Sequence, residues 1–166
     1  MRLRFEHVQS SPGASAPGNP AAEAAGLNGW IGWRRHSCLR MRTGMYSEQV
    51  LDHFKNPRNA GELAGATATV ELENPACGDV LRLSARVENG VVTAARFKAA
   101  GCVTAIACGS WLAEWMHGRR LAELEEISDL KISEALGGLA PATRHGAQLA
   151  ADALRALLAQ LPPAQR

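Results

Sequence analysis

Cysteine, aspartate and histidine residues at three places in this sequence have the side chains and the spacing to hold a metal ion. The first place is Asn74-Pro75-Ala76-Cys77-Gly78-Asp79, where a thiol and a carboxylate stand two residues apart. Since Gly78 leaves the backbone unrestricted, Cys77 and Asp79 can turn toward one metal ion. A turn with a buried cysteine and a capping aspartate is the competing interpretation, and the spacing alone favours it.

Cys102 is the second candidate, because it follows Gly101 at the junction between an expected strand and an expected helix. A sulfur just before a helix lies near the positive end of the helix macrodipole, so we expect a lowered pKa for the Cys102 thiol. A thiol of this kind is a better ligand or nucleophile. The alternative is a small buried hydrophobic residue, which is a common fate of free cysteine.

The third candidate is His145, near the start of the last expected helix. A lone histidine is more often a surface or core residue than a ligand, so it gains weight only if the other two places converge on it. Together, Cys77, Asp79, Cys102 and His145 would offer two sulfurs, one nitrogen and one oxygen. Zinc accepts a tetrahedral set of that composition.

Other residues with chemically active side chains have simpler interpretations. Cys108 lies six residues after Cys102, so on a helix the two face apart, and we assign Cys108 to packing. His53 is expected to be solvated or to cap a helix. Trp111 and Trp115 stand four residues apart, which is typical of a core stripe on a helix.

The elements that must position these residues begin with strands. Residues 67–73, 81–87 and 91–99 alternate between apolar and polar side chains. Asn89-Gly90, between the second and third of these, is a type I′ hairpin signal. The pattern therefore predicts a three-stranded antiparallel meander with one buried face.

Helices account for most of the remaining sequence. A short helix capped by Ser47 precedes the strands, and helices are expected at 104–117, 121–126, 130–136 and 141–161. The last of these carries an apolar stripe. Three consecutive strands followed by helices indicate the α+β class, with the helices packed on one face of the sheet.

Length and composition exclude several classes of protein. The chain has 166 residues, 46% of them hydrophobic, which suits one core of roughly 100–150 residues plus some spare chain. No apolar run approaches the ~18 residues that a spanning helix needs, so an integral membrane protein is excluded. Four cysteines without a signal peptide do not indicate a disulfide framework.

The charge divides the chain at residue 44. Residues 1–44 carry six arginines against two glutamates, whereas 45–166 carry 12 basic against 14 acidic residues. The second part is mildly acidic, which argues against nucleic acid as its partner. The first part is expected to be a disordered basic leader, because 9–29 has no apolar period. A transit peptide and a functional basic tail are alternatives, but we favour an over-extended start with Met45 as the natural initiator.

Several segments, in order along the chain, resemble the NifU N-terminal/IscU family of iron–sulfur cluster scaffolds. The resemblance begins with Tyr46-Ser47-Glu48-Gln49-Val50-Leu51-Asp52-His53-Phe54 and Asn56-Pro57-Arg58-Asn59. It continues with the segment 74–79, with Gly101-Cys102 and with Ala105-Ile106-Ala107. It implies a SufE/NifU-like (IscU-like) fold for a domain that occupies residues 45–166.

The family supplies three cysteines and an aspartate beside the first of them. The resemblance places Cys77, Asp79 and Cys102 at three of these positions, whereas the third family cysteine directly follows a histidine. His145 matches that histidine, but Gly146 stands where the cysteine is expected. The resemblance therefore implies that Cys77, Asp79, Cys102 and His145 bind iron and a transient [2Fe–2S] cluster, with zinc as an alternative metal for the same four residues.

The resemblance implies an iron–sulfur cluster assembly scaffold without turnover chemistry, in the bacterial cytoplasm. It would take sulfur from a cysteine desulfurase and pass a cluster to apo iron–sulfur proteins, with a homodimer around a shared cluster as one arrangement. Two alternatives stay open: a zinc-binding sulfur-relay partner of SufU type, and a degenerate module that binds the desulfurase. IscU proteins carry Leu-Pro-Pro-Val-Lys for an Hsp70-type chaperone. Here Leu139-Ala140-Pro141-Ala142-Thr143 argues against that partner.

Overall fold

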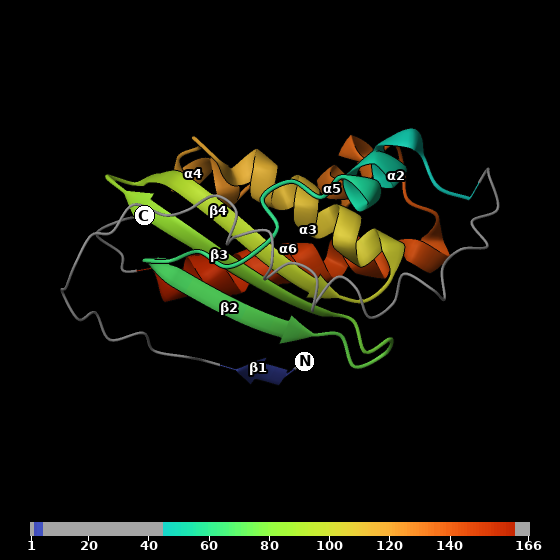
Figure 1. Cartoon of the computed structure of the whole chain (residues 1–166), viewed down its shortest axis with the longest axis horizontal. Helices are drawn as coiled ribbons and strands as arrows, with labels where there is room; N and C mark the ends of the chain where they lie inside the picture. The colour runs from blue at the N-terminus through green and yellow to red at the C-terminus, as the bar shows by residue number, and fades with distance from the viewer. Residues whose placement is uncertain (1, 5–44, 162–166) are drawn as a thin grey trace, which may run out of the picture.

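The sheet of this protein is antiparallel throughout, in a computed structural model that describes residues 2–4 and 45–161. Its strands follow chain order as β1 (Arg2–Arg4), β2 (Ala68–Glu73), β3 (Val80–Glu88) and β4 (Val91–Ala100) (Figure 1). Strands β2 to β4 confirm the predicted three-stranded meander. The turn between β3 and β4 has φ of 53° at Asn89 and 75° at Gly90, as a type I′ turn requires.

Strand β1 adds a short fourth strand beside β2 that the sequence pattern does not predict. In the antiparallel backbone register, Arg2 lies opposite Glu73 and Arg4 lies opposite Glu71. An edge strand presents unpaired backbone N–H and C=O groups, which a further segment can satisfy. Residues 2–4 thus differ from the disorder expected for residues 1–44, and the rest of that leader lies outside the described residues.

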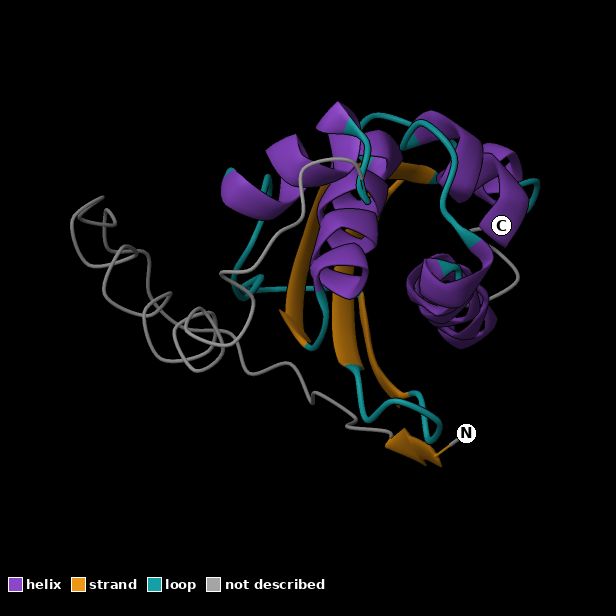
Figure 2. Cartoon of the chain, turned by 90° about the vertical axis from the view of Figure 1, so that its right-hand side faces the viewer, coloured by secondary structure: helices purple, strands orange, loops and turns teal. Residues whose placement is uncertain are grey.

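Helices form a second layer against the sheet, which confirms the predicted α+β class (Figure 2). The two long helices lie side by side, and α3 packs on β4 while α6 packs on β2 and β3. The helices are α2 (Glu48–Lys55), α3 (Val103–Met116), α4 (Leu121–Leu124), α5 (Asp129–Ala135), the 3-10 helix η2 (Pro141–Thr143) and α6 (His145–Gln160).

The core lies between these two layers. Strand β2 buries alternate side chains on the face toward the helices. Strand β3 follows the same pattern except at Ser84, which is also buried, and β4 follows it from Ala95 onward. The predicted apolar stripe of α6 is confirmed, because its six members are all buried: Leu149, Ala150, Ala153, Leu154, Leu157 and Leu158. Trp111 and Trp115 stack with ring centroids 5.8 Å apart and pack half-buried against this core.

A buried polar network fastens α2 to α3. The Nδ1 atom of His53 lies 2.9 Å from the Ser110 hydroxyl, which also accepts a hydrogen bond from the backbone N–H of Arg58 at 2.8 Å. The Arg58 guanidinium reaches Glu114 on α3 at 3.4 Å. The expectation that His53 is solvated or capping is therefore wrong. The packing of α2 on α3 buries the His53 ring and brings it to the Ser110 hydroxyl, and this packing cannot be read from the sequence around His53.

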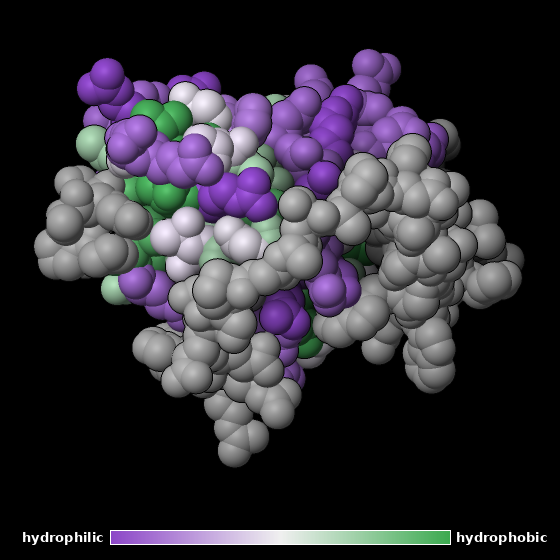
Figure 3. All heavy atoms as spheres, turned by 60° about the vertical axis from the view of Figure 1, so that its left-hand side comes forward, coloured by the Kyte–Doolittle hydropathy of each residue, from purple (hydrophilic) through white to green (hydrophobic). Residues whose placement is uncertain are grey.

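The outer surface is mixed in character. One face of the molecule shows hydrophobic side chains bordered by hydrophilic ones (Figure 3). Among the described residues, the large hydrophobic side chains that stand exposed are Met45 and Leu130. Within the same ranges, no helix has the length and apolar character needed to cross a membrane.

Candidate metal centre

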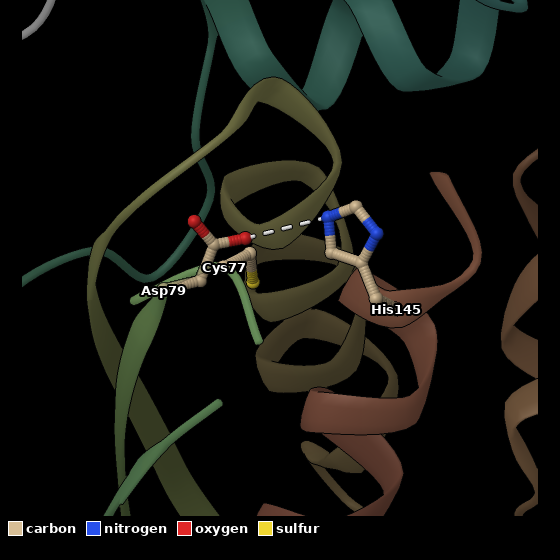
Figure 4. Close-up of side chains that lie close together, drawn as sticks. All are labelled: Cys77, Asp79 and His145. Carbon is tan, nitrogen blue, oxygen red and sulfur yellow. Dashed lines mark ion pairs between the residues drawn. The ribbon is translucent and has the colours of Figure 1, made fainter. Parts of the chain in front are cut away.

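The four candidate ligands come together from three separate segments. Cys77 and Asp79 lie in and after the turn from β2 to β3, Cys102 precedes α3 and His145 begins α6. One ligand atom each of Cys77, Asp79 and His145 lies within 4.8 Å of the others, and their side chains point toward one another (Figure 4). The Sγ atom of Cys102 lies 3.5 Å from Nε2 of His145. Their role as ligands stays a prediction.

The turn between β2 and β3 positions Cys77 at the surface. The Asn74 side chain accepts a hydrogen bond from the backbone N–H of Ala76 at 3.0 Å, and the Asn74 carbonyl accepts one from Gly78 at 2.8 Å. Gly78 has φ of +69°, a conformation that glycine adopts without steric strain. The exposed Cys77 can therefore be reached from outside while the turn keeps its sulfur near Asp79.

Asp79 is buried, and only one of its two carboxylate oxygens is hydrogen-bonded. Oδ1 accepts from the backbone N–H of Cys102 at 3.1 Å. Oδ2 is buried without a hydrogen-bond partner in the described part of the chain, and it lies 3.6 Å from Nε2 of His145. Buried carboxylate oxygens without partners are rare because their desolvation is unfavourable. This oxygen fits a metal ion, which would supply the missing interaction.

Gly101 allows the Asp79 carboxylate to occupy this place. A Cβ atom on residue 101 would lie 2.5 Å from Oδ1, 2.6 Å from Cγ and 2.9 Å from Cβ of Asp79. Any side chain at position 101 would therefore push the aspartate out of the site. From the sequence, Gly101 is significant only as the neighbour of Cys102. A glycine next to a candidate ligand is the signal that could have indicated this close approach.

Cys102 is the N-cap residue of α3. Its sulfur accepts a hydrogen bond from the backbone N–H of Ala105 at 3.4 Å and lies 3.0 Å from the Thr104 hydroxyl. Burial nevertheless raises the pKa of the Cys102 thiol, and the Asp79 carboxylate adds to the rise. The expectation of a lowered pKa is therefore wrong, because desolvation outweighs the hydrogen bonds with Thr104 and Ala105. A bound metal ion would displace this proton.

The other cysteines of the described chain differ in exposure. Partial desolvation of the Cys77 sulfur, together with the Asp79 carboxyl group, raises the pKa of that thiol. Cys108 is fully buried in the core, and its burial raises the pKa of its thiol. The assignment of Cys108 to packing is therefore confirmed. Cys38 lies outside the described residues.

Fold and site together define an α+β domain with a cysteine-containing candidate metal centre at the starts of two helices. Residues 45–165 match the family described as NifU-like N terminal domain. The chain belongs to this family.

Named scaffold proteins are among the relatives of the chain. It is 45% identical over 115 residues to the iron–sulfur cluster assembly scaffold protein IscU of Azotobacter vinelandii, covering 67% of this chain and 89% of that protein. It is 42% identical over 118 residues to the protein of the same name from Escherichia coli strain K12, covering 69% of this chain and 91% of the relative.

Two solved structures show the same fold. A NifU-like N-terminal protein from Brucella abortus aligns with a TM-score of 0.58 at 21% identity, over 70% of this chain and 93% of its own. A protein from Fervidobacterium islandicum, named as a scaffold protein for the SUF system, aligns with a TM-score of 0.58 at 19% identity, over 69% and 96%. These likenesses confirm the IscU/NifU-like fold that the sequence predicts.

Proposed function

We propose that this protein is an iron–sulfur cluster assembly scaffold that binds iron, holds a transient [2Fe–2S] cluster and passes it to apo iron–sulfur proteins. The observation that carries the proposal is the convergence of Cys77, Asp79, Cys102 and His145, with one Asp79 oxygen buried and without a hydrogen-bond partner in the described chain. Membership in the NifU-like N-terminal family and the named IscU relatives support it. The protein acts as a carrier.

The donor set suits a cluster that must be released. A [2Fe–2S] cluster needs four protein ligands, two on each iron, and this site offers two sulfurs, one nitrogen and one oxygen. An oxygen and a nitrogen bind iron in such a cluster less firmly than thiolates do. Asp79 therefore provides an exchangeable bond, and His145 completes the set from α6.

Cys77 is the thiol that a cysteine desulfurase reaches first, because it is exposed whereas Cys102 is partly buried. The Cys77 thiolate attacks the outer sulfur of the desulfurase persulfide and forms a new S–S bond. The S–S bond of the enzyme breaks, and the enzyme cysteine leaves as a thiolate. Reduction of the transferred sulfur to sulfide takes two electrons from an external reductant. We place these steps in the cytoplasm.

Anaerobic reconstitution of the full-length chain with iron, cysteine, a cysteine desulfurase and a thiol reductant tests the proposal. Iron, zinc and sulfide contents are measured together with the visible spectrum. We expect about two irons and two sulfides per cluster, lost in Cys102→Ala and kept in Cys108→Ala, the matched change of a buried cysteine outside the site. Bound zinc without a chromophore would instead identify a sulfur-relay protein. Binding of the desulfurase without any metal would identify a degenerate binding module.

A further inference from the structure

Gly146, the second residue of α6, lies buried against the first turn of α3. A Cβ atom on this glycine would lie 2.8 Å from the carbonyl carbon of Thr104, 3.0 Å from its oxygen and 2.9 Å from the backbone nitrogen of Ala105. These are backbone atoms of a packed helix, which cannot rotate away as the end of a flexible side chain can. Any side chain at position 146 therefore requires α6 to shift relative to α3.

The same close approach sets the geometry of the candidate metal centre. His145 begins α6 and Cys102 caps α3, so the separation of the two helix starts determines the 3.5 Å between Nε2 of His145 and Sγ of Cys102. Oδ2 of Asp79 lies 3.6 Å from the same nitrogen. A shift that makes room for a side chain at position 146 would carry His145 away from both partners.

We propose that Gly146 determines the ligand set of this site, because it closes the position from which α6 would otherwise supply a thiolate. The inference rests on the metal-binding role proposed above. His145 is then the ligand that α6 contributes, and the site holds two thiolates, one imidazole and one carboxylate. A set with fewer soft sulfur donors binds zinc well and holds an iron–sulfur cluster in exchangeable form. Gly146 itself touches no metal and is a positioning residue.

The test compares Gly146→Cys with Gly146→Ala in the full-length chain, because both add a Cβ atom and only the first adds a thiol. Ala142→Cys, at an exposed position on η2, is the control for an additional cysteine outside the packed contact. One readout is the Tm of the metal-free protein. The other is titration with Co²⁺, in which the sulfur-to-cobalt charge-transfer band grows with the number of bound thiolates.

We expect both Gly146 variants to lower the Tm by roughly 5–10 °C, because a Cβ atom overpacks the contact between α3 and α6. Both should weaken Co²⁺ binding roughly tenfold or more, as changes around a metal site commonly do, without any gain in charge-transfer intensity. Ala142→Cys should match the unaltered chain in both readouts.

A Gly146→Cys variant with an unchanged Tm and a stronger charge-transfer band would overturn the inference, because it would show room for a third thiolate. If that variant does not fold, Gly146→Ala decides, and an unchanged Tm in it overturns the inference as well. If the unaltered chain binds no Co²⁺, the proposed function fails together with the ligand set. A lowered Tm in both variants would still establish the packing constraint separately.

Discussion

The Sγ atom of Cys102 lies 3.5 Å from Nε2 of His145, although 43 residues separate the two in the chain. Each residue stands at the start of a long helix, since Cys102 caps α3 and His145 begins α6. The positive ends of two helix macrodipoles therefore meet at the candidate metal centre. This arrangement would favour negatively charged ligands there.

The three cysteines of the described chain should differ in their reaction with iodoacetamide. We expect Cys77 to react first because it is exposed, Cys102 more slowly because its sulfur is partly buried and its pKa is raised, and Cys108 only after unfolding. Peptide mapping by mass spectrometry of the metal-free protein at several times gives the order. Labelling of Cys102 before Cys77 would contradict the geometry of the turn between β2 and β3.

Substitution of Gly101 by alanine should displace the Asp79 carboxylate. The added Cβ atom would lie within 2.9 Å of three Asp79 atoms. The backbone at Gly101 does not have a positive φ, so the expected effect comes from this contact and not from backbone strain. We expect zinc affinity to fall roughly 10–100-fold, the usual effect of disturbing the support of a metal ligand. Competition titration with a chromophoric chelator measures it. Ala100→Ser, an exposed neighbouring change, is the control and should bind zinc as the parent does.

Stability should decrease in mild acid because of His53. Burial lowers the pKa of the His53 ring below its ordinary value of 6.5, so in acid the unfolded chain binds a proton that the folded chain resists. The contribution of the neutral His53 ring to the free energy of unfolding is fully present above pH 6.5. It is lost as the pH falls from there through the pKa of His53 in the folded protein. One such group changes the free energy of unfolding by at most about 1.4 kcal/mol per pH unit.

Urea unfolding at a series of pH values between 7.5 and 5.5 measures this slope. His53→Asn is the matched control, because its amide can face the Ser110 hydroxyl at the place of Nδ1 but does not titrate. We expect the control to have a smaller slope than the parent over this range. Equal slopes would assign the acid sensitivity to other groups.

The elements of the fold could be predicted from the sequence because each follows from local pattern. Alternation identified β2 to β4, Ser47 caps the helix that it precedes, and the Asn89-Gly90 turn has the expected conformation. Strand β1 could not be predicted in this way. Three residues carry no periodic signal, and their pairing depends on the free edge of β2.

The candidate site was harder to predict than the fold. Residue types identified the four candidate ligands. The distances between their side chains depend on how α6 packs on α3, and the spacing of residues in the sequence does not determine that packing. The pKa of Cys102 was wrongly expected to be low because its burial is a tertiary property. His53 was misjudged for the same reason, since Ser110 lies on another helix 57 positions away. The close contact of Gly146 with the backbone of α3 likewise becomes visible only in the packing of α6 against α3.

Asp79→Asn should separate the stability of the metal-free protein from its metal affinity. The buried Oδ2 atom of Asp79 has no hydrogen-bond partner in the described chain, so a neutral amide there removes a buried charge while Oδ1 can still accept from Cys102. We expect the metal-free variant to unfold at the same Tm or a higher one. Zinc binding should weaken by roughly tenfold or more, because the carboxylate ligand is lost.

Thermal unfolding with and without zinc measures both effects. A ligand at about 100 times its Kd stabilises the folded state by about 2.7 kcal/mol, so zinc at that level should raise the parent Tm by several degrees. At the same zinc concentration the increase should be much smaller in Asp79→Asn. Asp152→Asn, a substitution in the ion pair with Arg155 on α6, is the control and should leave the zinc-dependent increase intact. If Asp79→Asn lowers the Tm of the metal-free protein, the buried carboxylate itself stabilises the fold, and its availability to a metal ion is no longer the reason for its burial.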